Sequence, residues 1–250
     1  MSAVRILLED QVLRLTLARP EKKNALTGAM YEALAGALVR AESDPQVHVV
    51  LFDAEGDSFS AGNDLTEFAA VASGAIEPSA LKVRTFLDAL ATATLPYVAA
   101  VQGAAVGIGT TLLLHCDLVY LGEDAQLSTP FVNLALVPEA ASSVLLPERI
   151  GHARAFALFA LGETLDAQRA VELGLANAVL PSHTVREHAL AQAKALAKRP
   201  VGALRATKQL MRDAAAIRAV MAREIEMFSE RLRSEEALTA FKAFAARKRD

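Results

Sequence analysis

Alternating apolar and polar residues predict short strands over the first half of the chain. Residues 4–19 contain two such runs on either side of Glu9 and Asp10, a pattern that predicts a β-hairpin. Apolar residues at helical spacing follow in 25–45, and Pro45 ends that predicted helix. Further buried strands are predicted at 47–56, 96–103, 117–123 and 125–130.

Helical patterns separate these strands and then replace them. An alanine-rich helical stretch reaches about Thr94, and "AAVGIG" (104–109) is predicted to turn into a helix at 110–116. Beyond about residue 148 the strand signals fade, apart from "ANAVLP" (176–181). Amphipathic patterns then predict C-terminal helices at 184–200, 202–216, 217–232 and 234–249.

This order of elements predicts an α/β (α+β) fold, because the regular strand–helix–strand spacing of a doubly wound sheet is missing. We divide the chain into a mixed core at 1–195 and a helical region at 196–250. The chain has 250 residues, 53% of them hydrophobic and 22% charged, which is typical of a globular protein.

Charge and apolar run lengths limit the classes of partner. The net charge of −3 argues against a nucleic-acid partner. The most apolar stretch, 95–116, is interrupted by Gln102 and several glycines, so we expect no membrane span. The first residues do not resemble a secretion signal and "ARKRD" does not resemble a peroxisomal address, so we expect a cytoplasmic protein.

The thiol and imidazole residues do not form a recognisable reactive or metal-binding pattern. Cys116 is the single cysteine, which excludes an internal disulfide, and its apolar neighbours predict an unreactive buried thiol. The five histidines show no HxxxH or HExxH spacing, so we expect no metal site. Ser142 and Ser143 with His115 suggest a hydrolase, but neither serine lies in a G-x-S-x-G turn.

Two glycine turns are positioned to present backbone amides. "SAGND" (60–64) places Gly62 before Asn63, and "VGIGTT" (106–111) places Ile108 between glycines at a predicted helix start. Free N–H groups at such positions favour a developing negative charge. If the amides of Asn63 and Ile108 face one point, they form an oxyanion hole.

Several motifs, in order, resemble the crotonase family (enoyl-CoA hydratase/isomerase superfamily). They are "ARPEKKNALT" (18–27), "FSAGNDL" (59–65), "VQGAAVGIG" (101–109), "HCDLVYLGEDAQLSTPF" (115–131), "LVPEAASS" (136–143), "LPERIG" (146–151), "ETLDAQRAVELGLANAVLP" (163–181) and "SEEALTAF" (234–241). The resemblance implies a spiral of ββα units that holds an acyl-CoA site, followed by C-terminal helices that close the site and build a homotrimer or a dimer of trimers. It also implies a coenzyme A thioester as substrate and no separate cofactor.

The resemblance assigns roles to particular residues. It places the oxyanion-hole amides on Asn63 and Ile108. The two glutamates of family hydratases fall on Thr111 and Phe131, which cannot serve as a base or an acid. Glu139 matches the single catalytic glutamate of 3-enoyl-CoA isomerases in the family.

One carboxylate is sufficient for isomerisation. Glu139 would take a proton from C2 of a 3-enoyl thioester and return it at C4, about 2.5 Å away. The acyl pocket is predicted to include Phe131, Leu134 and Thr111, and apolar walls there would exclude water and raise the pKa of the carboxyl.

Coenzyme A contacts are also implied by the resemblance. The residues assigned to them are Lys22, Lys23, Ala25, Ala61 and Gly62. Lys82, Arg84, Arg247 and Lys248 are further candidates for the nucleotide phosphates, and Glu67 and Glu77 for the acyl pocket.

Three functions are therefore left for comparison. The first is a 3-enoyl-CoA isomerase that uses Glu139. The second is a hydratase or a ring-opening isomerase that uses the same glutamate on another acyl group. The third is a protein that binds acyl-CoA without catalysis.

Overall fold

The main sheet of the protein has an N-terminal hairpin at one edge. The computed structural model describes residues 2–77 and 82–247. Strands β1 (Val4–Glu9) and β2 (Val12–Leu17) pair antiparallel, as the alternating pattern predicts. The sheet has six strands in the order β1-β2-β3-β4-β6-β9, and its remaining pairs are parallel. These further strands are β3 (Val49–Ala54), β4 (Tyr97–Val101), β6 (Leu118–Gly122) and β9 (Ala178–Leu180).

A second, three-stranded sheet has the order β5-β7-β8. It consists of β5 (Ala104–Val106), β7 (Gln126–Ser128) and β8 (Thr164–Asp166). Two of these strands differ from the prediction, which has 104–106 in a turn and no strand at 164–166. Each has only three residues, too few for a period of two to be visible, and each is held by pairing with β7.

Helices connect the strands and form the C-terminal part. In the first part they are α1 (Gly28–Ser43), α2 (Leu65–Ala72), α3 (Val83–Thr92), α4 (Ile108–Thr111), α5 (Ser142–Ile150), α6 (His152–Ala160) and α7 (Ala167–Glu172). Short 3-10 turns are η1 (Pro20–Lys22), η3 (Leu112–His115) and η4 (Val132–Leu134). The C-terminal helices are α8 (Val185–Ala197), α9 (Val201–Met211), α10 (Ala214–Leu232) and α11 (Glu235–Arg247).

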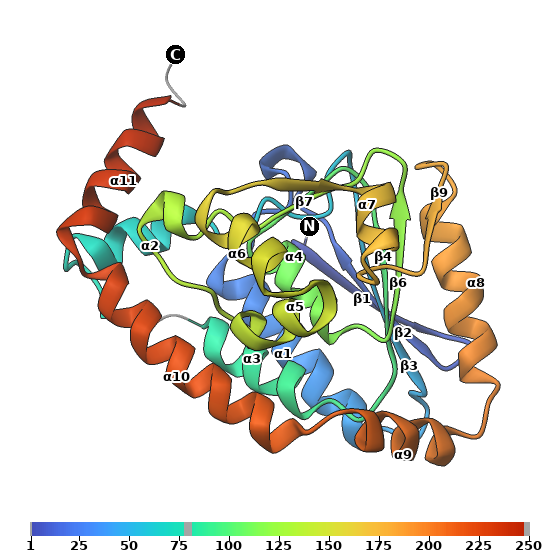
Figure 1. Ribbon diagram of the computed structural model, residues 1–250. Coiled ribbons are helices and arrows are strands. Elements are labelled where there is room, and N and C mark those ends of the chain that lie inside the picture. Colours follow the sequence, from blue (N-terminus) through green and yellow to red (C-terminus); the bar gives the residue numbers. More distant parts are fainter. Residues whose placement is uncertain (1, 78–81, 248–250) are drawn as a thin grey trace.

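Both faces of the six-stranded sheet are covered. Alternate residues of β3 point to opposite faces, and all six are buried. Val49 and Leu51 pack with α8, whereas Val50 and Phe52 belong to the larger core that includes α1 and α3. Figure 1 shows α8 on one side of the sheet and α1 and α3 on the other.

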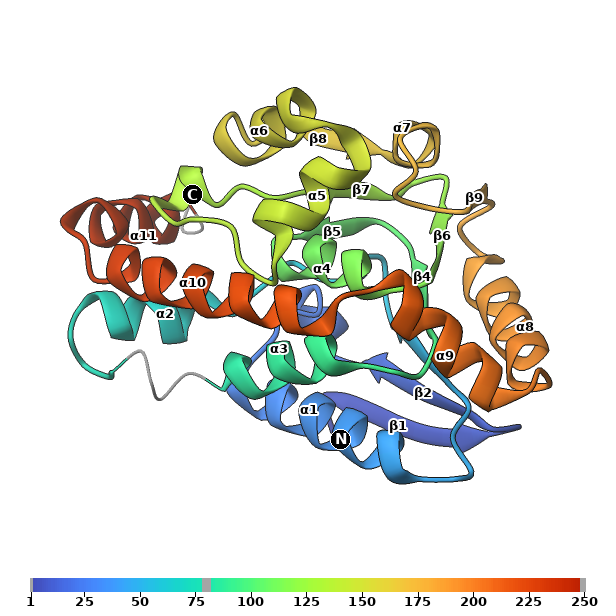
Figure 2. The same cartoon turned by 60° about the horizontal axis from the view of Figure 1, so that its bottom comes forward.

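The C-terminal helices α10 and α11 are part of the same core. Ile217, Met221, Leu232 and Phe241 are buried together with the core residues of the main sheet. Figure 2 shows α10 lying across the molecule between α3 and α5, with α11 beside α2. The predicted division at 195/196 falls inside α8.

The break between α9 and α10 lies earlier than predicted. The sequence analysis placed it at 216/217, but α9 ends at Met211 and α10 begins at Ala214. The Asp213 side chain accepts a hydrogen bond from the Ala216 N–H at 2.9 Å and caps α10. A capping aspartate before three alanines is the signal that marks this start.

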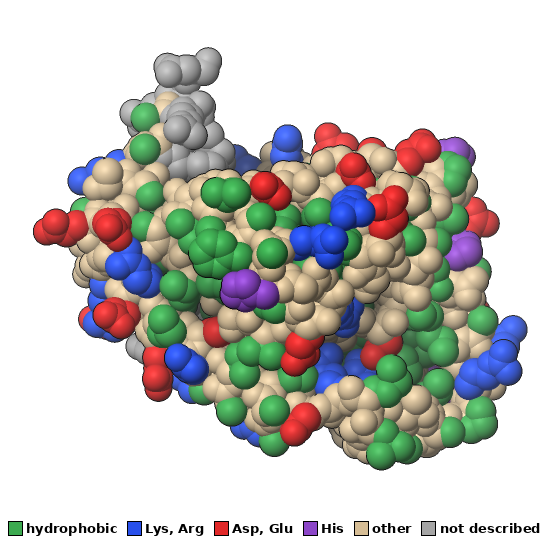
Figure 3. Space-filling model, viewed as in Figure 1, with side chains coloured by type: hydrophobic (Ala, Val, Ile, Leu, Met, Phe, Trp, Pro, Cys, Tyr) green, Lys and Arg blue, Asp and Glu red, His purple; other side chains and the backbone are tan. Residues whose placement is uncertain are grey.

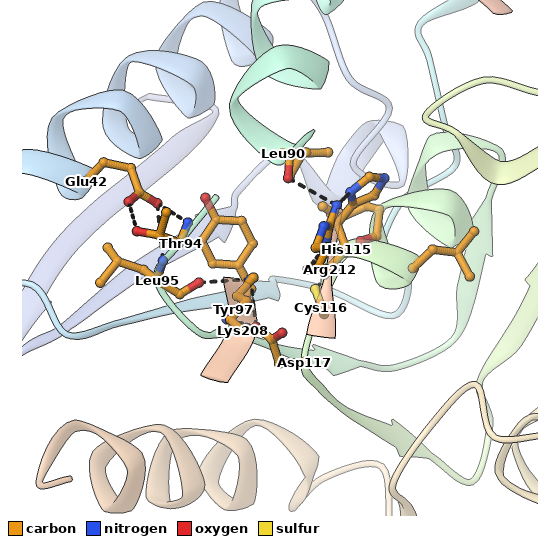
Figure 4. Close-up of polar contacts among 12 residues, drawn as sticks. Glu42, Leu90, Thr94, Leu95, Tyr97, His115, Cys116, Asp117, Lys208 and Arg212 are labelled. Carbon is orange, nitrogen blue, oxygen red and sulfur yellow. Dashed lines mark hydrogen bonds and ion pairs between the residues drawn. The ribbon is translucent and has the colours of Figure 1, made fainter. Parts of the chain in front are cut away.

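Buried polar contacts anchor α9 to the sheet (Figure 4). Lys208 Nζ donates to Asp117 Oδ2 at 2.7 Å and to the Leu95 carbonyl at 2.9 Å, and it lies 4.2 Å from the Tyr97 ring centroid. Next to these contacts is a cavity of about 550 Å³, lined by Lys208, Asp117 and Arg149 among others. Figure 3 shows this face hollowed above α9, with basic and acidic side chains in the hollow.

The described residues contain no candidate membrane-spanning helix. Among residues 2–77 and 82–247, no helix combines the length and the apolar character that a bilayer span requires.

Candidate active site

The first glycine turn is held by a serine and an asparagine. The Ser60 hydroxyl donates to the Asn24 carbonyl at 2.9 Å and accepts from the Gly62 N–H at 3.1 Å. The Asn24 side chain in turn donates to the carbonyls of Glu55 and Ser58, at 2.8 Å each. These contacts hold the loop around Ser60 against the segment around Asn24.

Gly62 brings the two turns into contact. Its φ is +88°, and a Cβ at this position would lie 2.9 Å from the Val106 carbonyl oxygen. A larger residue would therefore push the loop 60–64 away from the second turn.

The backbone pairing around Asn63 determines where its amide points. The Leu26 N–H donates to the Gly62 carbonyl, and the Asp64 N–H donates to the Leu26 carbonyl, both at 2.8 Å. In such a parallel bridge, the N–H of the intervening Asn63 faces the opposite side. The Asn63 side chain accepts a hydrogen bond from the buried Tyr31 hydroxyl.

The second amide lies at the start of α4. Ile108 is the first residue of this helix, so its N–H has no acceptor within the helix. Gly107, with φ +55°, precedes it, and the Gly107 N–H donates to the Ser128 carbonyl at 2.9 Å. Within the described parts of the chain, neither the Asn63 N–H nor the Ile108 N–H donates a hydrogen bond to a protein atom.

Glu139 is a buried carboxyl with one hydrogen-bond donor. Its residue is 5% exposed, and the Thr111 hydroxyl donates to its Oε1 at 2.6 Å. Burial raises the pKa of Glu139 to about 8, with a smaller contribution from the negative charge of Glu224, while the Thr111 hydrogen bond lowers it. A carboxyl with this pKa is both a usable base and a usable acid near neutral pH.

Two adjoining cavities meet at Asn63. The larger, of about 680 Å³, is lined by Asn63, Glu139, and apolar residues of α2, α3 and α10. The second, of about 490 Å³, is lined by both glycine turns, by Phe131 and Leu134, and by residues of α11. Phe68 and Phe228 line both cavities, with their rings 5.6 Å apart in an edge-to-face contact.

Three glutamates line the larger cavity, and they differ in exposure. Glu226 and Glu230 on α10 are exposed, whereas Glu139 is buried. Glu139 is therefore the carboxyl of this wall that is removed from solvent and best suited to proton transfer.

The family of the chain follows from its sequence. A family model described as enoyl-CoA hydratase/isomerase matches residues 8–250, nearly the whole chain. The chain belongs to the enoyl-CoA hydratase/isomerase family. The resemblance deduced from the motifs is confirmed.

Relatives within this family carry different activities in their names. Enoyl-CoA delta isomerase 2 of Rattus norvegicus is 37% identical over 246 residues, which cover 96% of this chain and 62% of that protein. This chain therefore spans less than two thirds of that curated relative. The 2,3-dehydroadipyl-CoA hydratase of Escherichia coli (strain K12) is 32% identical, and the match covers 98% of this chain and 96% of that protein.

Solved structures of the family have the same fold. The crystal structure of an enoyl-CoA hydratase/isomerase from Pseudoalteromonas atlantica T6c superposes with a TM-score of 0.92 at 39% identity, covering 98% of each chain. The predicted mixed α/β, crotonase-like fold is confirmed.

The predicted acyl-pocket residues of this family member occupy different positions. Phe131 and Leu134 line the cavity next to the glycine turns. Thr111 is fully buried and lies behind Glu139, where its hydroxyl contacts the carboxyl. The prediction of Thr111 as a pocket wall is therefore revised to a role in holding Glu139.

The residues predicted to contact coenzyme A lie in two neighbouring loops. Lys22 and Lys23 are exposed, and the Ala61 N–H donates to the Lys23 carbonyl at 2.8 Å, which places this loop beside the first glycine turn. Ala61 and Gly62 line the second cavity. Ala25 is half-buried, and its carbonyl accepts from Arg19 at 3.0 Å.

The weaker candidates have mixed outcomes. Arg84 lines the larger cavity, Lys82 pairs with Glu32 at 3.0 Å, and Glu67 accepts from the Gly28 N–H at 3.0 Å. Glu77 is exposed. Lys248 lies outside the described residues, as does the side chain of Arg247.

The contacts of His115 agree with the rejection of a serine hydrolase. The His115 Nε2 contacts the Ala140 carbonyl at 2.8 Å and its Nδ1 contacts Arg212, so neither ring nitrogen is bonded to Ser142 or Ser143. Cys116 is buried, and burial raises the pKa of its thiol to about 12, as expected for an unreactive thiol.

Sequence reasoning missed Tyr31 and Glu224. Glu224 is 6% exposed and lies on the buried face of α10 with Met221 and Phe228, at helical spacing. A glutamate among apolar residues on one helix face is the signal that identifies it. Tyr31 gives no such signal, because a buried tyrosine in an amphipathic helix is ordinary.

Proposed function

We propose that this protein is a Δ3-Δ2 enoyl-CoA isomerase. Glu139 takes a proton from C2 of a 3-enoyl thioester, and the same carboxylic acid returns it at C4. The amides of Asn63 and Ile108 hold the negative thioester oxygen of the dienolate between the two steps.

The observation that supports this reaction most strongly is the environment of Glu139. The carboxyl is 5% exposed, lines the same cavity as Asn63, and has its pKa raised to about 8 by burial. A group that accepts a proton and then gives it back works best when its pKa lies near the ambient pH.

The residues at the two hydratase positions argue against efficient hydration. The positions at which family hydratases carry glutamates hold Thr111 and Phe131. The Thr111 hydroxyl donates to Glu139. The ring of Phe131 packs against that of Phe159, with 6.1 Å between the ring centroids. Water addition by two glutamates therefore lacks both of its acids at these positions.

The thioester would enter through the second cavity. Its walls combine the glycine turns with apolar residues of η4 and α11, which would suit a pantetheine arm with the reacting carbonyl at Asn63. Lys22, Lys23 and Ala25 lie at the neighbouring loop and are the proposed nucleotide contacts.

Substitution of Glu139 by glutamine tests the proposal. Glu139→Gln keeps the size of the side chain but cannot accept a proton, so conversion of a 3-enoyl-CoA should fall at least about 10³-fold. Conjugation is followed as new ultraviolet absorbance, and thioester binding should persist. Full activity of this variant would remove Glu139 from the mechanism.

The alternative functions give different results in the same assays. A hydratase would form a 3-hydroxyacyl product from a 2-enoyl-CoA, in keeping with the name of the Escherichia coli relative. A ring-opening isomerase would require Glu139 but leave 3-enoyl-CoA unchanged. A non-catalytic binding protein would bind the thioester without exchange of the C2 proton in deuterated water.

Assembly and location complete the proposal. We expect a homotrimer or a dimer of trimers and a cytoplasmic protein, although one relative, of Mus musculus, is named as peroxisomal. Light scattering of the purified chain tests the assembly.

A further inference from the structure

The turn that follows Glu139 has a strained backbone. Ala140 and Ala141 have φ values of 60° and 55°, in the left-handed region that glycine and asparagine favour. The Ser142 N–H donates to the Glu139 carbonyl at 3.1 Å and closes the turn. Alanine rarely adopts this conformation, so neighbouring groups must hold it.

Glu224 on α10 holds one side of this turn. Its Oε2 accepts from the Ala141 N–H at 2.6 Å, and its Oε1 accepts from the Ser143 N–H at 3.0 Å and from the Ser143 hydroxyl. Burial raises the pKa of Glu224 above its ordinary value, but both oxygens act as acceptors, and these hydrogen bonds favour the ionised carboxylate. The same contacts cap α5, since its N-cap residue Ala141 has no side chain that can do so.

Arg212 holds the other side of the turn through His115 (Figure 4). Arg212 donates to His115 Nδ1, so the His115 proton lies on Nε2, and this N–H donates to the Ala140 carbonyl at 2.8 Å. Burial and the nearby Arg212 charge lower the pKa of His115 to about 3, and the ring therefore stays neutral.

Glu224 is also the buried charged neighbour of Glu139. The titratable and charged groups around Glu139 are Tyr31 from α1, His115 from η3 and Glu224 from α10, with Arg84, Glu226, Glu230 and Arg233 on the exposed walls of the cavity. Tyr31 is neutral because burial raises its pKa well above 10, and His115 is neutral. Solvent screens the charges on the exposed walls.

We propose that Glu224 is a positioning residue for Glu139. From α10 it holds the strained Ala140–Ala141 turn that sets the direction of the Glu139 side chain, and its negative charge favours the protonated form of Glu139. This inference rests on the proposed function, since it assigns to Glu224 an effect on the proton carrier of that reaction.

Two substitutions should shift the pH profile in opposite directions. In Glu224→Gln the like charge is lost, so the midpoint of kcat/KM against pH should move down while kcat falls about tenfold. In Thr111→Val the hydrogen bond to the carboxylate is lost, so the midpoint should move up. A purely structural role for Glu224 would lower kcat without moving the midpoint.

Two controls isolate the buried charge. Glu235→Gln removes an exposed glutamate from the first turn of α11 and should leave the midpoint and kcat unchanged. Ser143→Ala removes the hydroxyl that lowers the pKa of Glu224, but both backbone N–H donors remain, so the midpoint should move less than in Glu224→Gln.

Glu224→Asp covers the case in which the glutamine variant does not fold. It keeps the charge but shortens the side chain, so the turn loosens, kcat falls and the midpoint stays. An unmoved midpoint in folded Glu224→Gln, or an unchanged kcat in Glu224→Asp, would overturn the inference.

A direct titration separates this inference from the proposed function. The infrared carboxyl signal of Glu139, identified by its loss in Glu139→Gln, should titrate at lower pH in Glu224→Gln whatever the reaction is. If Glu139→Gln is inactive and this signal does not move, the inference about Glu224 fails and the isomerase proposal stands. If Glu139→Gln keeps full activity, the isomerase proposal fails instead.

Discussion

Glu139 illustrates how a single side chain is adapted by its surroundings. It is buried against apolar walls, accepts one hydrogen bond from Thr111, and lies near the negative charge of Glu224. Burial and the like charge favour the neutral acid, while the hydrogen bond favours the carboxylate. The balance raises the pKa to about 8, where both forms are populated near neutral pH.

The pH dependence of the isomerase reaction should report this group. In the proposed reaction the free enzyme needs Glu139 ionised to take the C2 proton, so kcat/KM should rise with pH, reach half its maximum near pH 8 and level off above that. Initial rates with a 3-enoyl-CoA between about pH 5 and 10 measure the midpoint. A midpoint near the ordinary carboxyl value of 4.5 would show that burial does not control this group.

The same pKa predicts how Glu139→Gln changes stability. Between pH 4.5 and about 8 the folded chain keeps a proton on Glu139 that the unfolded chain has lost, so the stability of the parent protein falls as pH rises. Glutamine does not titrate. The unfolding free energy of the variant, relative to that of the parent, should therefore rise by up to about 1.4 kcal/mol per pH unit in this window. Urea unfolding of both proteins at about pH 5 and pH 8 provides the test, and equal slopes with pH would contradict it.

At the scale of elements, the site depends on the close approach of two glycine turns. Ser60 and Asn24 fix the first turn, and the α4 start fixes the second. The two amides can face one oxygen only if the turns keep this separation.

Gly62→Ala should disturb this arrangement. The new Cβ would lie 2.9 Å from the Val106 carbonyl oxygen, at a residue whose φ is +88°. We expect a loss of about 1–3 kcal/mol in stability and a larger relative loss in kcat than in thioester affinity. Gly202→Ala is the control, because Gly202 lies in α9 and a Cβ there meets nothing within 4 Å. Since alanine favours a helix more than glycine does, the stability of this variant should rise slightly. Unchanged kcat in Gly62→Ala would argue against an oxyanion hole at this turn.

For the whole molecule, the C-terminal helices are structural parts of the core and of the site. Residues of α10 line both cavities and residues of α11 line the second one. Lys208 on α9 is 5% exposed and bonded to Asp117 of the strand region. The helices therefore determine the shape of the site within one chain.

Lys208→Met tests the anchoring of α9. Among the described residues it leaves the Asp117 carboxylate with the Tyr97 N–H contact alone, at 2.7 Å, but Asp117 is partly exposed, so we expect a loss of about 1.5 kcal/mol in unfolding free energy. Adding Asp117→Asn should recover part of that loss, because the uncompensated charge is removed. Urea unfolding measures both variants. A loss below about 0.5 kcal/mol would mean that the ion pair contributes no net stability.

Much of the element order was predictable because its signals are local. The alternation in 4–19 predicted the hairpin, and apolar residues at helical spacing predicted helices α8 to α11. Strands β5 and β8 were missed, since three residues contain too little pattern and their pairing partner is distant in sequence.

The sequence by itself determined the family, the order of the main elements, and Glu139 as the candidate base. Motifs and short-range periodicity depend only on residues that are close together in the chain. Only the tertiary structure decided what surrounds that base. Thr111 lies 28 residues from Glu139, and Glu224 lies 83 residues from Ala141, yet both contacts determine how Glu139 is held. Such contacts leave no local pattern, since their strength depends on burial and direction that arise only when the chain has folded.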